Sequence, residues 1–110
     1  MKVFAQTLNL KDDLEVIEKY KEYHRNAWPE VLDSLKKVGI TDMKIFLHGR
    51  RLFMYMETTD SFVPEVDLPR YLEQDPKCQE WEDLMGEFQE PVPGAALGEK
   101  WSMMEQVFQL

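Results

Sequence analysis

Cysteine is nearly absent from this sequence, and long apolar runs are absent altogether. The 110 residues include one cysteine, Cys78, which permits neither an internal disulfide nor a cysteine-based zinc site and fits a reducing compartment. No stretch approaches the roughly 20 apolar residues of a membrane-spanning helix, and residues 1–6 lack the apolar core of a signal peptide. We therefore expect a soluble, cytoplasmic protein with no membrane partner.

Basic residues are also scarce. The chain carries 13 lysines and arginines against 21 aspartates and glutamates, a net charge of −8. This balance leaves no basic stripe to neutralise phosphates, which argues against nucleic acids and anionic membrane surfaces as partners. Hydrophobic residues nevertheless make up 44% of the sequence and charged residues 31%, ordinary proportions for a globular protein. Length and composition together predict one folded domain over residues 1–110.

The spacing of apolar residues predicts alternating strands and helices. Pro29 should break the first helix near Trp28, because proline lacks a backbone N–H and disfavours a helical residue before it. Gly49 lies between two alternating segments and suits a hairpin turn. Asp75 and Pro76 mark the start of a second helix. We predict strands near 3–10, 43–47, 52–56 and 101–110, helices over 13–38 (with the break) and 76–88, and a loop over 60–71 with at most a helical turn.

The predicted order β-α-β-β-α-β is the split arrangement of a ferredoxin-like α+β sandwich, with an antiparallel sheet and both helices on one face. The other face also carries bulky side chains, among them Phe46, Phe53 and Tyr55. Two helices cannot cover both faces of a sheet, so the uncovered apolar face calls for a second copy of the chain. We expect a homodimer formed face to face.

Three aromatic or heteroaromatic residues suggest a site. Tyr20, His24 and Trp28 recur every four residues and would form one stripe on an unbroken helix. Histidine has an ordinary pKa of about 6.5, so it can donate or accept a proton near neutral pH. Aromatic residues at this spacing are more often core, and His24 would then be a half-buried structural histidine. Trp81 and Trp101 likewise could stack on a sugar or other flat ligand, although a tryptophan at the spacing of Trp81 is more often part of the core or of an interface.

Signals for metal ions and cofactors are missing. His48 falls in the predicted hairpin turn, and two histidines so differently placed do not make a metal site. The sequence contains no glycine-rich phosphate loop, no GxSxG motif and no pair of catalytic cysteines. We therefore expect neither a metal ion nor an organic cofactor.

Four segments, taken together, resemble the L-rhamnose mutarotase family. The motif Y-x-x-x-H-x-x-x-W-P-E runs from Tyr20 to Glu30, and three blocks follow in the family's order: Leu52–Glu57, Glu80–Met85 and Met104–Phe108. The resemblance spans nearly the whole chain. It implies a dimeric ferredoxin-like α/β barrel that interconverts the α and β anomers of a 6-deoxy sugar without a cofactor. It also implies that His24 is the catalytic acid and that Tyr20 and Trp81 contact the sugar.

Two positions depart from the rhamnose-specific pattern. Glu82 stands where those members carry a second tryptophan, and Met43 stands where they carry a sugar-contacting tyrosine. An acidic side chain can bind sugar hydroxyls that an indole cannot. The family resemblance makes L-rhamnose the first expectation for the substrate. The two departures make L-fucose or another 6-deoxyhexose the alternative.

Anomer exchange needs few groups, because a proton leaves the anomeric hydroxyl, another is added to the ring oxygen, and the opened ring closes by the reverse steps. Two other functions stay open from the residues. One is a small dimeric ferredoxin-like oxygenase or haem-handling protein with His24 as an axial ligand, since one fold hosts many functions. The other is a non-catalytic dimer that binds a sugar without exchanging its anomers.

Overall fold

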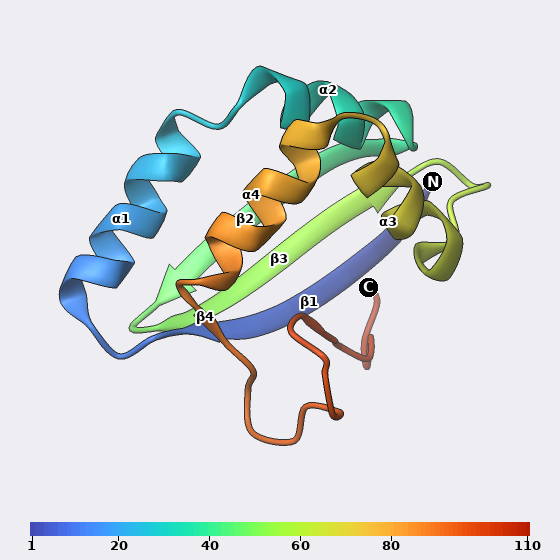
Figure 1. The fold of residues 1–110 in the computed structure, drawn as a ribbon. Helices are drawn as coiled ribbons and strands as arrows, with labels where there is room; N and C mark the ends of the chain where they lie inside the picture. The colour runs from blue at the N-terminus through green and yellow to red at the C-terminus, as the bar shows by residue number, and fades with distance from the viewer.

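Four helices lie on one face of an antiparallel sheet (Figure 1). The computed structural model describes all residues, 1–110. The strand order is β2-β3-β1-β4, with β5 also paired to β1, as in the predicted split arrangement. The elements are β1 (Lys2–Leu10), α1 (Leu14–Arg25), α2 (Pro29–Lys37), β2 (Ile40–His48), β3 (Arg51–Thr58), α3 (Pro64–Glu73), α4 (Pro76–Gly86), β4 (Gln89–Glu90) and β5 (Ser102–Met103).

The three long strands form the frame of the domain. β3 pairs along its whole length with both β1 and β2, and the β2–β3 turn contains Gly49 at φ of 60°, a left-handed conformation that glycine adopts without steric cost. Alternate residues of a strand point to opposite faces. Leu8 of β1 lies opposite Leu52 of β3, and both side chains are buried beneath the helices. The inner face of the sheet is therefore one wall of the core.

Local sequence signals set the helix starts as predicted. The side chain of Asp13 accepts a backbone N–H of the first turn of α1 at 2.8 Å, and Asp75 does the same for α4 at 2.8 Å. Trp28 is extended, with ψ of 131°, and Pro29 is the first residue of α2. The helical segment is therefore broken at the predicted residue, and the break separates α1 from α2.

The prediction of a loop over residues 60–71 was wrong, because this segment contains most of helix α3. Pro64 occupies the first helical position, where a missing N–H costs nothing. The carboxylate of Asp67 accepts the N–H of Val63 at 2.7 Å. Pro69 lies inside the helix, as the sixth of its ten residues, where its missing N–H removes one backbone hydrogen bond. The two prolines obscured a helical spacing of inward-facing residues: Leu68, Tyr71 and Leu72.

The prediction of a last strand over residues 101–110 was wrong in extent. Only Ser102–Met103 pair with β1, followed by one hydrogen bond from the Met104 N–H to the Ala5 carbonyl at 2.8 Å. Residues 105–110 have no strand partner within the chain, and Phe108 is 76% exposed. Further along the same edge of β1, Asn9 and Leu10 pair with β4, a two-residue strand that was not predicted from the sequence.

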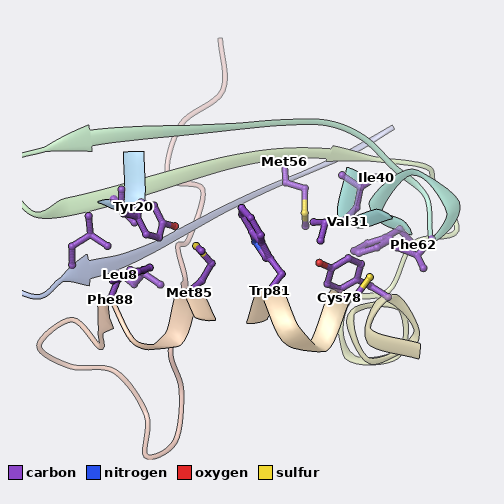
Figure 2. Close-up of a cluster of buried hydrophobic side chains, with 14 residues drawn as sticks. Leu8, Tyr20, Val31, Ile40, Met56, Phe62, Cys78, Trp81, Met85 and Phe88 are labelled. Carbon is purple, nitrogen blue, oxygen red and sulfur yellow. The ribbon is translucent and has the colours of Figure 1, made fainter. Parts of the chain in front are cut away.

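The core fills the space between the sheet and the helices (Figure 2). Tyr20 and Phe88 lie toward one end of it, Phe62 and Cys78 toward the other, and Trp81 stands between them. No helix combines the length and apolar character needed to cross a bilayer.

Candidate functional site

A cavity of about 580 Å³ lies between the sheet and the helices. All four helices contribute to its wall, as do the inner faces of β2 and β3 and the segment that precedes β5. Tyr20, His24 and Trp81 all line it. The structure thus brings together the three residues singled out in the sequence, on two helices some 60 positions apart in the chain.

His24 lies between two aromatic rings. Tyr20 precedes it by one turn of α1, and the centroids of the two rings are 4.2 Å apart at an angle of 32°. The indole of Trp81, carried by α4, meets the imidazole edge-on, with centroids 5.3 Å apart at 70°. Trp81 projects from α4 toward the sheet (Figure 2). It is both a buried core residue and part of the cavity wall, so its two sequence-based interpretations are compatible.

Trp28 is not part of this stripe. α1 ends at Arg25, so Trp28 no longer continues the face that carries Tyr20 and His24, and it does not line the cavity. Its ring instead packs against Trp81, with centroids 5.1 Å apart at 72°, and the Lys77 ammonium lies 5.4 Å from its centroid. Trp28 therefore supports the indole of Trp81 and has no direct access to a ligand in the cavity.

The tautomer of His24 follows from its hydrogen bond. Its Nδ1 lies 2.8 Å from the carbonyl oxygen of Tyr20, and because a carbonyl can only accept, Nδ1 must carry the proton. Burial lowers the pKa of His24 below 6.5, an effect that the bond to the Tyr20 carbonyl partly offsets. The ring is thus neutral at pH 7, and Nε2 is left as a proton acceptor.

Tyr20 stays protonated under the same conditions. Burial raises its pKa to about 12, the side chain of Gln89 acts in the opposite direction, and the Glu82 carboxylate raises the pKa further. The phenol can therefore donate a hydrogen bond to a ligand. Burial also raises the pKa of Tyr71, another residue of the wall, with smaller contributions from Cys78 and Glu82.

Both departures from the rhamnose-specific pattern lie in the cavity wall. Met43 contributes an apolar side chain from β2, and Glu82 contributes a carboxylate from α4. Sequence differences at these two positions therefore change the surface that a ligand would meet.

Three further polar wall residues were not identified from the sequence. Gln6 left a signal, because it is a polar residue on the otherwise apolar inner face of β1, between Phe4 and Leu8; its amide contacts the Met103 sulfur at 3.6 Å. The others lie beyond the end of α4, where no periodicity points to them: Gln89 and Lys100. Trp101, which the sequence suggested along with Trp81 as a stacking surface, also lines the cavity.

The structure shows no group of three or more histidine, cysteine, aspartate or glutamate side chains placed to share a metal ion. His48 is the last residue of β2, is exposed, and does not line the cavity.

Comparison with known proteins identifies the family. Residues 3–110 match the family model of L-rhamnose mutarotase. The chain belongs to the L-rhamnose mutarotase family. Membership confirms the predicted enzyme class, an isomerase that acts on carbohydrates.

Three curated relatives of the family illustrate its range. A UPF0734 protein from Dictyostelium discoideum is 47% identical, and the match covers 99% of this chain and 90% of the relative. An L-fucose mutarotase from Xanthomonas campestris is 39% identical, with 100% and 89% covered. An L-rhamnose mutarotase from Opitutus terrae is 32% identical, with 78% and 76% covered.

Solved structures support the fold. An L-rhamnose mutarotase from Formosa agariphila superposes with a TM-score of 0.71 at 21% identity, covering 100% of this chain and 99% of that one. A type II polyketide cyclase from Streptomyces glaucescens superposes with a TM-score of 0.63 at 15% identity, covering 100% and 97%. At these identities the likeness concerns the fold alone, which is shared by proteins of different function.

Proposed function

We propose that this protein is a mutarotase that interconverts the α and β anomers of a free 6-deoxyhexose, and that His24 transfers the protons. The observation that carries the proposal is a neutral imidazole of fixed tautomer, inside an aromatic cavity, in a chain of the mutarotase family. The aromatic and aliphatic wall suits the methyl group and apolar ring face of a deoxy sugar.

The tautomer of His24, with its proton on Nδ1, defines the order of proton transfers. Nε2 of His24 takes the proton of the anomeric hydroxyl, the C1–O5 bond breaks as the C1=O1 bond forms, and the imidazolium gives the proton to O5. Rotation about C1–C2 presents the other face of the aldehyde. The same steps in reverse close the ring, so no proton or electron is consumed. His24 thus starts each cycle as a base and acts as the acid that the family resemblance implies only after it has gained this proton.

Tyr20 and Trp81 have supporting roles in this scheme. The protonated phenol of Tyr20, one turn from His24, can donate a hydrogen bond to a sugar hydroxyl beside the reacting carbon. The indole of Trp81 offers an apolar surface to the ring and limits access of water to the imidazole. We assign both to sugar binding, and neither to proton transfer.

We infer that L-fucose is preferred over L-rhamnose, whereas the sequence analysis placed L-rhamnose first. The L-fucose mutarotase matches the entire chain at 39% identity, and the rhamnose enzyme matches 78% of it at 32%. The carboxylate of Glu82 in the cavity wall adds a hydrogen-bond acceptor that an indole at this position would lack.

Saturation-transfer NMR between the two anomeric signals tests this function directly. L-fucose, L-rhamnose and a 6-hydroxy hexose such as L-galactose should be compared at one pH, each corrected for the spontaneous rate. We expect the largest enzyme-dependent exchange with L-fucose. Binding without exchange would establish the non-catalytic alternative, and a haem absorption band in the purified protein would support the haem-handling one.

We also propose that two copies associate through the outer face of the sheet, as a homodimeric α/β barrel. Phe46 is 55% exposed there and stacks on Phe53, with ring centroids 6.0 Å apart at 29°. Burial of these rings against a second copy would remove apolar surface from water. A cytoplasmic location stays a prediction.

A further inference from the structure

The segment between β4 and β5 forms a strap beside the cavity. The strap, Pro91–Trp101, runs out beyond β1 and returns along it (Figure 1). It contains two turns, closed by backbone hydrogen bonds from Ala95 to Val92 at 3.1 Å and from Glu99 to Ala96 at 3.0 Å.

The end of the strap is held in place by its own contacts. The Glu99 carboxylate accepts the Ser102 hydroxyl at 2.8 Å and the Ala96 N–H at 3.3 Å. Trp101 packs against the core, and Ser102 pairs with β1. Lys100 therefore lies between anchored residues, and its backbone position is fixed beside the cavity.

Helix α4 makes room for the Lys100 side chain at a single residue. A Cβ added at Gly86 would lie 2.6 Å from Nζ of Lys100, closer than real Cβ contacts, so a side chain at Gly86 would make the flexible end of Lys100 move. The absence of a side chain at Gly86 thus leaves space that the ammonium occupies. Glu82 lies one turn earlier on α4, so the two charged groups border the same part of the cavity.

These are the two charged side chains of the cavity wall, and neither has a protein partner. No ion pair or side-chain hydrogen bond is formed by Lys100 or by Glu82. An ammonium offers only donors and a carboxylate only acceptors. The wall thus presents one unpaired donor and one unpaired acceptor to whatever occupies the cavity.

We propose that Lys100 is a sugar-binding residue, which donates a hydrogen bond to one hydroxyl of the substrate while Glu82 accepts from another, and that Gly86 leaves the space in which the Lys100 ammonium lies. The proposal rests on the mutarotase function proposed above. Lys100 is exposed and Glu82 is half-buried. A donor and an acceptor placed on one wall distinguish sugars by the orientation of their hydroxyls, because a misplaced hydroxyl loses the hydrogen bond that the donor or the acceptor offers. Lys100 and Glu82 together would thereby set the preference among 6-deoxyhexoses.

A structural role for Lys100 is the competing explanation. The last turn of α4 has no basic residue, and a cation there would interact favourably with the negative end of the helix dipole. This role predicts a loss of stability on removal of the charge and leaves sugar binding unchanged.

The test uses Lys100→Met, which keeps the length of the side chain and removes the charge, and Gly86→Ala, which fills the space of the ammonium. Lys36→Met is the matched control, because Lys36 is exposed on α2 and lies outside the cavity wall. KM and kcat for L-fucose and L-rhamnose are measured by NMR exchange, and stability by urea unfolding. Alanine favours helices more than glycine, so Gly86→Ala should fold at least as stably as the wild type.

We expect Lys100→Met to raise KM for the preferred sugar about tenfold or more, with a smaller change in kcat. Gly86→Ala should raise KM by a smaller factor, because it displaces the flexible end of Lys100 but keeps the charge. The double variant should match Lys100→Met, because both changes act on the same contact. The preference between the two sugars should weaken in all three variants, while Lys36→Met matches the wild type.

An unchanged KM and sugar preference in Lys100→Met, with wild-type exchange intact, would overturn this inference and leave the mutarotase function standing. Additive effects in the double variant would equally overturn the role of Gly86. A wild-type protein without enzyme-dependent exchange on any sugar would refute the proposed function, and the inference with it.

Discussion

On β3, Leu52, Met54 and Met56 point toward the helices and are buried, whereas Phe53 and Tyr55, which alternate with them, point away and stay partly exposed. On β1, Leu8 and Leu10 are buried whereas Val3 is exposed, and on β2 the contrast is weaker, with Met43 and Ile45 partly buried between exposed or partly exposed neighbours. The inner face is almost wholly apolar and supports the core and the cavity floor. The outer face combines aromatic rings with charged side chains.

The outer face has the composition of an interface. Its centre is the stacked pair Phe46 and Phe53. Beside it the Tyr55 hydroxyl donates to Glu57 at 2.7 Å, and the Lys44 ammonium lies 5.6 Å from the Tyr55 ring centroid. An apolar centre with a polar rim is typical of contacts between subunits. One sheet therefore has two roles on alternate residues. Its inner face forms part of the cavity wall, and its outer face, as we propose, forms the contact between two copies of the chain.

The largest effect should come from the cavity side. We expect His24→Ala to lower the enzyme-dependent exchange rate by about 10²- to 10⁴-fold, the usual contribution of acid–base catalysis, while sugar binding and folding persist. His48→Ala, at the exposed end of β2, is the matched control and should keep the wild-type rate. NMR exchange, corrected for the background rate, measures both. A folded His24→Ala with wild-type exchange would make the imidazole structural and Glu82 the better candidate.

Two substitutions in β1 test how much each face of the sheet contributes to the free energy of unfolding. Leu8 is fully buried on the inner face of β1, and Val3 is 44% exposed on the outer face. We expect Leu8→Ala to lower the free energy of unfolding by about 2–5 kcal/mol, because it leaves a cavity in the core. Val3→Ala should cost less than about 1 kcal/mol. Urea unfolding at one protein concentration gives both values, and equal losses would contradict the assignment of faces.

The outer face should respond in assembly. Phe46→Glu places an unpaired charge in the proposed interface, so we expect the dimer to weaken at least about tenfold while the free energy of unfolding of the subunit changes little. Sedimentation at micromolar concentration should give a dimer for the wild type and a smaller mass for the variant. A fully active monomer in the wild type would remove the outer face from the proposal.

The smallest effect concerns pH. Only neutral His24 can accept the proton, so kcat/KM should be constant at higher pH and fall on the acidic side, with a midpoint below 6.5 because burial lowers the pKa. Stability follows the same sign: in the unfolded chain His24 is protonated near pH 6.5, whereas the folded site resists protonation, so the free energy of unfolding declines as pH falls below 6.5. His24→Gln should lose this component in urea unfolding. Activity that rises on acidification would contradict a neutral base.

Helix starts and strand faces were predictable because they depend on neighbours in the sequence. Asp13 and Asp75 cap the adjacent turn, Pro29 acts on Trp28, and the alternation along 52–56 needs only the geometry of a strand. Tyr20 and His24 were placed together for the same reason, since they are one helical turn apart.

Four results depended on contacts between distant segments. The helix α3 persists despite Pro69 because its apolar side packs against the rest of the domain, which local rules for proline do not consider. The last strand ends at Met103 because strand length depends on available partners. The two-residue β4 exists through its pairing with β1. Gln89 and Lys100 line the cavity because the chain after α4 folds back beside it.

The sequence by itself determined which residues could do chemistry: a single titratable histidine on a helix with an aromatic neighbour one turn away, and motifs that indicate the mutarotase family. The tertiary structure decided the state in which these groups meet a ligand. Burial lowers the pKa of His24, and the Tyr20 carbonyl fixes the proton on Nδ1, so Nε2 is left as a proton acceptor. Trp81 joins it across the fold. Protonation state and the approach of side chains from separate helices depend on the surrounding atoms in three dimensions, and no local pattern contains them.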